Sequence, residues 1–218
     1  DYSLGNNFAD FASQFSKDSR YRTELYKLRR KFMSHADGLI HADLHTSNIL
    51  ASQDKMKIID MEFAFMGPFG YDLGYLVGNL ISQYCAACFK RFPSEQNRKQ
   101  FKAYLLATIQ SLIETYMKTF TLCWERSVKE RYRGQQGLLQ SILQEVMVDM
   151  PGYASMVNWF RSVSDIPYPD FDVIENKDAK RNATVLSLMI DWGIMFGRYK
   201  YQSCLLYTSP SPRDPKTS

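Results

Sequence analysis

Long apolar runs are missing from this chain of 218 residues. None approaches the roughly eighteen residues that a membrane-spanning helix needs, so we expect no membrane partner. The first residues, DYSLGNNFADF, also lack the basic start and apolar stretch of a signal peptide. We therefore expect a cytoplasmic protein. Since Asp1 is not an initiator, we also expect that residues upstream of it are absent.

Cysteine and histidine are scarce as well. The chain has four cysteines (Cys85, Cys88, Cys123 and Cys204), and its three histidines all lie within residues 35–45. Cys85 and Cys88 have the CxxC spacing, but no second pair completes a zinc site and no thioredoxin-like context surrounds them. We predict reduced thiols in helical core positions.

Charge of one sign is not in large excess, because the formal net charge is only +4. Basic residues gather at 27–31 and 129–133, as on solvated helix faces, and aromatic residues do not interleave with them in any RNA-reading pattern. We therefore expect no nucleic-acid partner. The hydrophobic fraction of 45% is enough for one domain with a real core.

Helical periodicity dominates the apolar pattern. It predicts helices over 20–36, 73–91, 94–131, 136–150 and 179–202, with breaks at Pro93 and Pro151. Short strand-like runs at 49–51 and 56–59 flank a polar turn and predict one β-hairpin, while 67–74 and 167–178 are predicted to be loops. The fold class is therefore α+β, mainly helical, with a small hairpin near the start.

Residues 205–218 have a different composition. They are rich in proline and serine and carry almost no apolar side chains, which predicts a disordered tail after a domain over 1–204. The stretch LLYTSPSPRD also resembles translated sequencing-adapter sequence, so an origin outside the natural protein stays open.

The stretch LIHADLHTSNIL contains the pattern that carries chemistry. Asn48 stands five residues after Asp43, which is the spacing of the kinase catalytic loop H-x-D-x-x-x-x-N. After the predicted hairpin, Asp60 ends a second apolar run, where a further acid can meet a metal ion. Phosphoryl transfer needs these parts: a carboxylate beside the attacking hydroxyl, and oxygen ligands that hold Mg²⁺ against the phosphates of ATP.

These requirements assign candidate roles. Asp43 is the predicted catalytic base, and Asp60, Asn48 and Glu62 are the predicted Mg²⁺ ligands. His41 is predicted to support the loop by packing and hydrogen bonding. Taken singly, each Asp or Asn is more simply a turn or cap residue. All of them together at this spacing favour the kinase-type site.

The continuation resembles a particular family. Asp60-Met61-Glu62 differs from the D-F-G of protein kinases, and GPFGYDLG after EFAFM is similar to the corresponding segment of methylthioribose kinases, within the aminoglycoside phosphotransferase and choline kinase group. The similarity is good over residues 20–90 and weaker over 145–200. The resemblance implies the C-terminal lobe of a protein-kinase-like fold, with Asp72 bracing the catalytic loop. It also implies ATP-dependent phosphorylation of the 1-hydroxyl of 5-methylthioribose in methionine salvage, and leaves a homodimer open.

The sequence departs from the family at several positions. The family usually has Gly in place of Ala42, Pro in place of Met61 and Gly-Ser in place of Ser47-Asn48. Where the family has two adjacent arginines near the sugar, this chain has Phe160-Arg161, so Arg161 alone is the predicted substrate-binding residue.

No Gly-rich phosphate loop and no strand lysine precede residue 41, so we expect that the N-terminal lobe is absent and that the fragment alone is inactive. Three functions stay open on the sequence: a methylthioribose kinase, another small-molecule kinase of the same group, or a non-catalytic pseudokinase.

Overall fold

Helices make up most of the chain in the computed structural model, which describes residues 17–164 and 168–201. None of the helices in those ranges is long and apolar enough to span a membrane. In chain order the elements are α2 (Ser19–Ser34), β1 (Gly38–Ile40), η1 (Thr46–Asn48), β2 (Ile49–Ala51), β3 (Met56–Ile58), β4 (Phe65–Gly67), α3 (Gly70–Ala87), α4 (Glu95–Ser127), η2 (Glu130–Tyr132), α5 (Gln136–Val163), α6 (Pro169–Asp172), α7 (Lys177–Gly197) and η3 (Arg198–Lys200).

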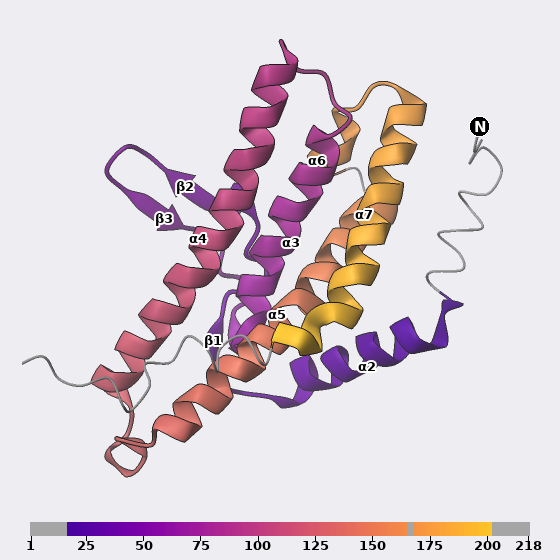
Figure 1. The fold of residues 1–218 in the computed structure, drawn as a ribbon. Coiled ribbons are helices and arrows are strands. Elements are labelled where there is room, and N and C mark those ends of the chain that lie inside the picture. Colours follow the sequence, from indigo (N-terminus) through magenta and orange to yellow (C-terminus); the bar gives the residue numbers. More distant parts are fainter. Residues whose placement is uncertain (1–16, 165–167, 202–218) are drawn as a thin grey trace, which may run out of the picture.

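The core lies between α3, α5 and α7, which run side by side, while α4 covers α3 from outside and α2 crosses one end of α5 and α7 (Figure 1). Leu73, Val77, Val146 and Met150 form the buried cluster between α3 and α5. Burial of such side chains contributes about 1.5–3 kcal/mol each, so this contact holds the helical body together.

Glycine lets α3 approach α5 closely. A Cβ on Gly74 would lie 2.6 Å from the Met150 carbonyl oxygen, and one on Gly78 would lie 2.6 Å from the Ala154 carbonyl oxygen. Both distances are below any normal contact with a backbone atom, so only glycine fits at these two turns of α3. The close packing fixes the height and rotation of α3 against the body.

The four strands form two small antiparallel sheets. β1 pairs with β4, with Leu39 opposite Met66, and β2 pairs with β3, with Leu50 opposite Lys57. The β2–β3 hairpin projects away from the helical body (Figure 1), and Leu50, Met56 and Ile58 on it are exposed. The first sheet holds the chain before and after the hairpin together.

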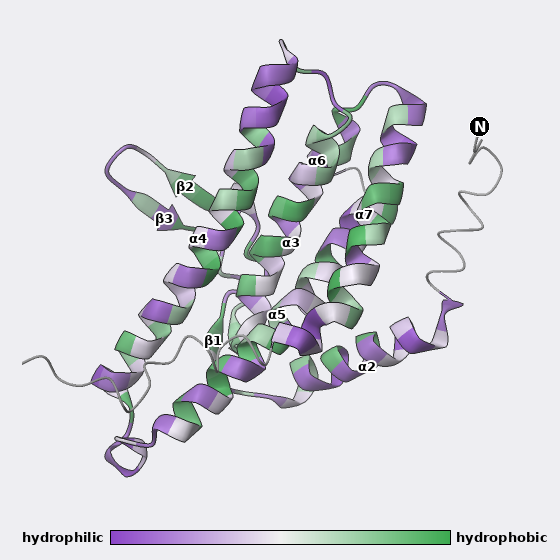
Figure 2. Cartoon of the chain, in the orientation of Figure 1, coloured by the Kyte–Doolittle hydropathy of each residue, from purple (hydrophilic) through white to green (hydrophobic). Residues whose placement is uncertain are grey.

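Helix α2 is amphipathic, with hydrophilic and hydrophobic residues along its whole length (Figure 2). Asp18 caps its start by accepting hydrogen bonds from the Arg20 and Tyr21 amides. Its buried face includes Glu24, which accepts from Arg198 Nη2 at 2.6 Å. This ion pair ties α2 to the residues that follow α7.

The predicted mainly helical α+β fold with a hairpin at 49–58 is confirmed. The predicted loop over 67–74 is wrong, because β4 ends at Gly67 and α3 begins at Gly70. The glycines that suggested a loop serve the close packing of α3 on α5. The β1–β4 sheet was also not predicted, since its three-residue strands are too short to show a period.

The predicted break at Pro151 is wrong too. α5 continues through this buried proline to Val163, although proline lacks the N–H that would bond to the Met147 carbonyl. Packing of both halves of α5 against α3 outweighs that loss. The predicted loop at 167–178 contains the short helix α6 and the start of α7, which Asn176 caps by accepting from the Ala179 amide.

The cysteine prediction holds in part. Cys85 on α3, Cys88 just after the end of α3 and Cys123 on α4 are free thiols; of these three, Cys85 is buried and Cys123 is exposed. Burial raises the pKa of the Cys85 thiol, which keeps it protonated. Cys204 and the predicted tail over 205–218 lie outside the described residues.

Candidate active site

The candidate catalytic loop is the segment between β1 and η1, and it carries Asp43 part-way out to solvent. Ala42, just before Asp43, has a backbone φ of 68°, in the left-handed region that favours glycine. This conformation explains why the related family usually has glycine here. The backbone bends at Ala42, between the end of β1 and Asp43.

His41 lies buried beneath this loop, and both of its ring nitrogens have partners. Nε2 is 2.8 Å from the Ile59 carbonyl oxygen, to which it donates, and Nδ1 accepts from the Asp43 amide at 3.3 Å. With both nitrogens engaged, the imidazole acts as a brace between two segments. It therefore links the Asp43 backbone to the residue just before Asp60.

Asn48 makes a second link between the same two segments. Its carbonyl oxygen accepts from the Ile59 amide at 3.0 Å, and its side-chain Nδ2 donates to the Asp43 carbonyl oxygen at 3.1 Å. The amide oxygen Oδ1 of this buried residue thus faces away from Asp43. His41 and Asn48 together fix the Asp43 loop against the strand end that leads into Asp60.

Asp60 and Glu62 follow this strand end and are both exposed. Asp60 has a φ of 65°, a left-handed conformation that Asp tolerates better than most residues. A tight turn closed by the Ala64 amide and the Met61 carbonyl oxygen carries Glu62. Both carboxylates therefore stand on short connectors next to the catalytic loop.

The oxygen set of Asp60, Asn48 and Glu62 fits Mg²⁺. Within residues 17–164 and 168–201 no three His, Cys, Asp or Glu side chains converge as a ready-made metal cluster. Mg²⁺ in nucleotide sites needs only one or two carboxylates, with water and phosphate oxygens as its other ligands. The exposed carboxylates of Asp60 and Glu62 and the amide oxygen of buried Asn48 are oxygen donors of the kind that Mg²⁺ takes.

One face of α3 contacts the catalytic loop along its length. Half-buried Asp72 accepts from the His41 amide at 2.6 Å and from the Ala42 amide at 3.0 Å. Burial raises the pKa of Asp72, and the two backbone hydrogen bonds partly offset that rise. These are the contacts that the predicted bracing role requires.

Two further residues on the same face of α3 contact the loop. Tyr75 donates from its hydroxyl to Asp43 Oδ1 at 2.7 Å, and Asn79 pairs with Thr46 Oγ1 at 3.0 Å. Positions 72, 75 and 79 are three and four residues apart, so they share one side of a helix. The sequence prediction missed Tyr75 and Asn79 because it placed residues 67–74 in a loop, which hid this spacing.

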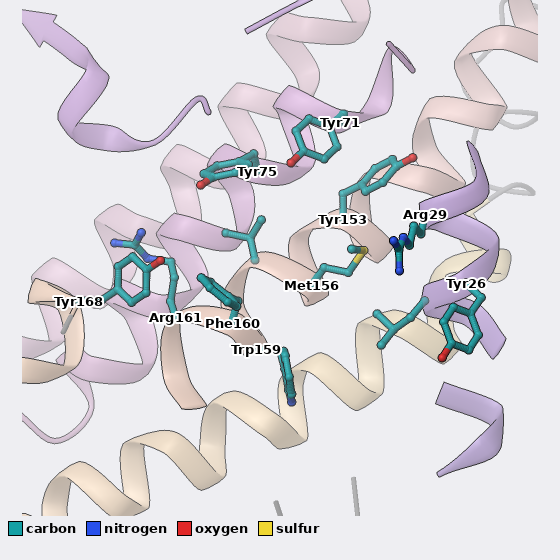
Figure 3. Close-up of a pocket in the computed structure, with 12 residues that line it drawn as sticks. Tyr26, Arg29, Tyr71, Tyr75, Tyr153, Met156, Trp159, Phe160, Arg161 and Tyr168 are labelled. Carbon is teal, nitrogen blue, oxygen red and sulfur yellow. The ribbon is translucent and has the colours of Figure 1, made fainter. Parts of the chain in front are cut away.

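A cavity of about 410 Å³ adjoins Tyr75 (Figure 3). Figure 3 shows Tyr71 and Tyr75 from α3 on one side, Tyr26 and Arg29 from α2 on the other, and side chains of α5 between them. Its walls are largely aromatic and apolar, and they consist of Leu25, Tyr26, Arg29, Tyr71, Tyr75, Tyr153, Met156, Val157, Trp159, Phe160, Arg161 and Tyr168. Such a cavity suits a small organic molecule with an apolar part.

Arg161, the predicted substrate-binding residue, lies in the wall of this cavity. Its guanidinium pairs with Asp170, with Nε 2.7 Å from Oδ2, and stacks on the Tyr168 ring at 4.3 Å. With the Asn79 amide oxygen turned toward it, Arg161 also donates to Asn79 at 3.2 Å. The structure therefore brings Arg161 close to the α3 face that supports the Asp43 loop.

Comparison with known proteins shows what this chain is similar to. The model of the phosphotransferase enzyme family matches residues 8–112, which include Asp43, Asn48, Asp60, Glu62 and Asp72. The matched segment, just under half of the chain, is similar to that family. The chain is also 35% identical over 186 residues to a methylthioribose kinase of Geobacillus thermodenitrificans, covering 82% of this chain and 44% of the relative.

Other curated relatives have the same name. A methylthioribose kinase of Geobacillus sp. strain WCH70 is 32% identical, and methylthioribose kinase 2 of Oryza sativa subsp. japonica is 29% identical; each covers 88% of this chain and 47% of the relative. The predicted resemblance is thus confirmed, and it extends well beyond residues 20–90. The chain spans about half the length of the curated relatives that it matches.

Proposed function

We propose that this phosphotransferase chain is the C-terminal lobe of a protein-kinase-like enzyme that uses ATP and Mg²⁺ to phosphorylate the 1-hydroxyl of 5-methylthioribose in methionine salvage. The lobe is proposed to cover residues 1–204. The observation that carries the proposal is the double link of His41 and Asn48 to Ile59. It holds the Asp43 loop against the segment of Asp60, as in-line transfer from a metal-bound phosphate requires.

In the proposed reaction, Asp43 orients the acceptor hydroxyl and accepts its proton. A new bond forms between the acceptor oxygen and the γ-phosphorus while the bond from that phosphorus to the β–γ bridging oxygen breaks, leaving ADP. Asp60, Asn48 and Glu62 would hold Mg²⁺, which when bound neutralises phosphate charge. Asp72 and His41 keep the loop in place through its backbone.

The aromatic cavity supports a small acceptor with an apolar group. The charged side chains in its wall are the two arginines, Arg29 and Arg161, and a cationic acceptor such as an aminoglycoside or choline would gain no acidic partner from these lining residues. A sugar with a thioether tail fits this chemistry better, with Arg161 beside the sugar. The relatives named methylthioribose kinase support the same choice.

The exposed apolar residues around the site also support the lobe assignment. Leu39, Met56 and Phe63 are 68%, 68% and 59% exposed, respectively, although they lie on or beside the strands of the site. In the proposed fold this surface is where the nucleotide and an N-terminal lobe lie. Such a patch needs a covering partner in solution.

The test is a Mg²⁺-dependent ADP-release assay on the longest reading frame that contains these 218 residues. Methylthioribose is compared with other sugars, an aminoglycoside and choline, and Asp43→Asn is the matched variant. We expect turnover selective for methylthioribose, lost on chelation of Mg²⁺, and reduced about 10²- to 10⁴-fold in Asp43→Asn. Turnover with another acceptor instead would show that the substrate is not methylthioribose. No turnover with any acceptor would favour a pseudokinase.

A further inference from the structure

Among the α3 side chains that contact the catalytic loop, Tyr75 differs from the others in what it contacts. Asp72 binds the loop backbone at His41 and Ala42, and Asn79 pairs with Thr46. Tyr75 reaches the carboxylate of Asp43 itself, at 2.7 Å. The phenol is therefore in a position to set how the proposed base is oriented.

The chemistry of this contact fits a permanent donor. Burial raises the pKa of Tyr75, and the hydrogen bond to the Asp43 carboxylate raises it further, so the phenol keeps its proton at neutral pH. A neutral O–H that donates to a carboxylate makes a charge-assisted hydrogen bond, which is stronger than one between neutral groups. Rotation of the Asp43 carboxylate then breaks a strong bond.

The two carboxylate oxygens of Asp43 have different partners. Tyr75 occupies Oδ1, while Oδ2 lies 3.5 Å from His45 Nε2, too far for a strong hydrogen bond. Oδ2 therefore keeps free acceptor capacity for the hydroxyl of a substrate. The ring of Tyr75 meanwhile forms part of the wall of the aromatic cavity (Figure 3).

We propose that Tyr75 is a positioning residue for the base: its hydroxyl holds Asp43 Oδ1 so that Oδ2 faces the acceptor in the cavity that the Tyr75 ring lines. This inference rests on the proposed kinase function. The substrate proton goes to Asp43, and the Tyr75 proton stays on its own oxygen. Tyr75 thus connects the place where the acceptor binds to the group that activates it.

The experiment compares Tyr75→Phe with Tyr21→Phe in the longest reading frame that contains this chain. Phenylalanine keeps the ring and removes only the hydroxyl. Tyr21 is a matched control, because its hydroxyl hydrogen-bonds Ser155 Oγ at 2.8 Å in the core between α2, α5 and α7, and Tyr21 is not among the residues that line the cavity. The kcat and KM for methylthioribose and ATP are measured, and urea titration gives the folded fraction of each variant.

We expect Tyr75→Phe to lower kcat about tenfold or more while both KM values stay within about twofold, because loss of alignment at a reacting group costs rate. Tyr21→Phe should keep the wild-type kcat per folded molecule. In an Asp43→Asn background, Tyr75→Phe should cause no further loss, since its effect passes through Asp43. A residue that only stabilises the fold would not show this dependence.

The other outcomes overturn the inference in distinguishable ways. An unchanged kcat in Tyr75→Phe, or an equal loss with and without the Asp43 carboxylate, removes Tyr75 from the mechanism and leaves the kinase function standing. A faster Tyr75→Phe variant means that the phenol competes with the acceptor for Asp43. A wild-type protein that turns over no acceptor removes the proposed function and this inference together.

Discussion

Replacing Gly74 with alanine should destabilise the protein, although alanine is the better helix former. In an unconstrained helix this change gains about 1 kcal/mol. The added methyl would lie 2.6 Å from the Met150 carbonyl oxygen and 2.6 Å from Tyr153 Cβ, so α3 must move away from α5. Overpacking of this kind costs about 1–3 kcal/mol, and here the blocking atoms belong to a helix backbone and a Cβ that cannot rotate aside.

The matched control is Gly193→Ala on α7. No atom lies within 4 Å of a Cβ built on Gly193, so this variant should gain the helix propensity of alanine, about 0.5–1 kcal/mol. Urea titrations followed by circular dichroism give both free energies of unfolding, and an unchanged m-value shows that the same transition is compared. A Gly74→Ala protein stabilised as much as Gly193→Ala would refute the close α3–α5 contact.

Two further predictions concern Ala42 and Glu24. Ala42→Gly should raise the free energy of unfolding by about 1 kcal/mol, because glycine adopts a φ of 68° without strain. Ala103→Gly inside α4 is the control and should lower the free energy of unfolding by about the same amount. Equal losses of stability in both variants would contradict the left-handed conformation of Ala42. Burial alone would raise the pKa of Glu24, but hydrogen bonds from Lys27, Tyr199 and Arg198 lower it from 4.5 to about 2. A carboxyl group whose pKa is lower in the folded state stabilises the fold at pH values above its unfolded pKa, and this stabilisation is lost as the pH falls from about 4.5 toward 2. In acid titrations, Glu24→Gln should therefore lose less stability than wild type over that pH range. If Glu24→Gln loses stability with falling pH as steeply as wild type does, Glu24 is not the source of that pH dependence.

Much of the site could be predicted because its chemistry is local in sequence. Asp43, Asn48 and Asp60 stand at a spacing that few other functions require, and the hairpin between them has a clear turn. The structure then supplies the link that a spacing cannot show, namely the two contacts to Ile59. The roles of these residues stay predictions until the assays are done.

What the sequence hid depends on contacts between distant segments. Gly70 and Gly74 signalled a loop, yet they are helical because α5 packs against them. Pro151 signalled a helix end, yet the packed body keeps α5 continuous. Tyr75 carried no signal of its own, because nothing near it in sequence shows that it meets Asp43 from 32 residues away.

The alignment of α3 with the catalytic loop also determines where the chain can change length. One residue inserted between Tyr75 and Asn79 would rotate Asn79 about the helix axis by about 100° and break its contact with Thr46. The same rotation would turn the rest of α3 away from the face that packs against α5. An insertion beside Gly134 meets no such limit, because nothing lies within 4 Å of a Cβ there and the segment between α4 and α5 is exposed. Natural variants of this protein should therefore differ in length around residue 134 and keep the length of α3 constant.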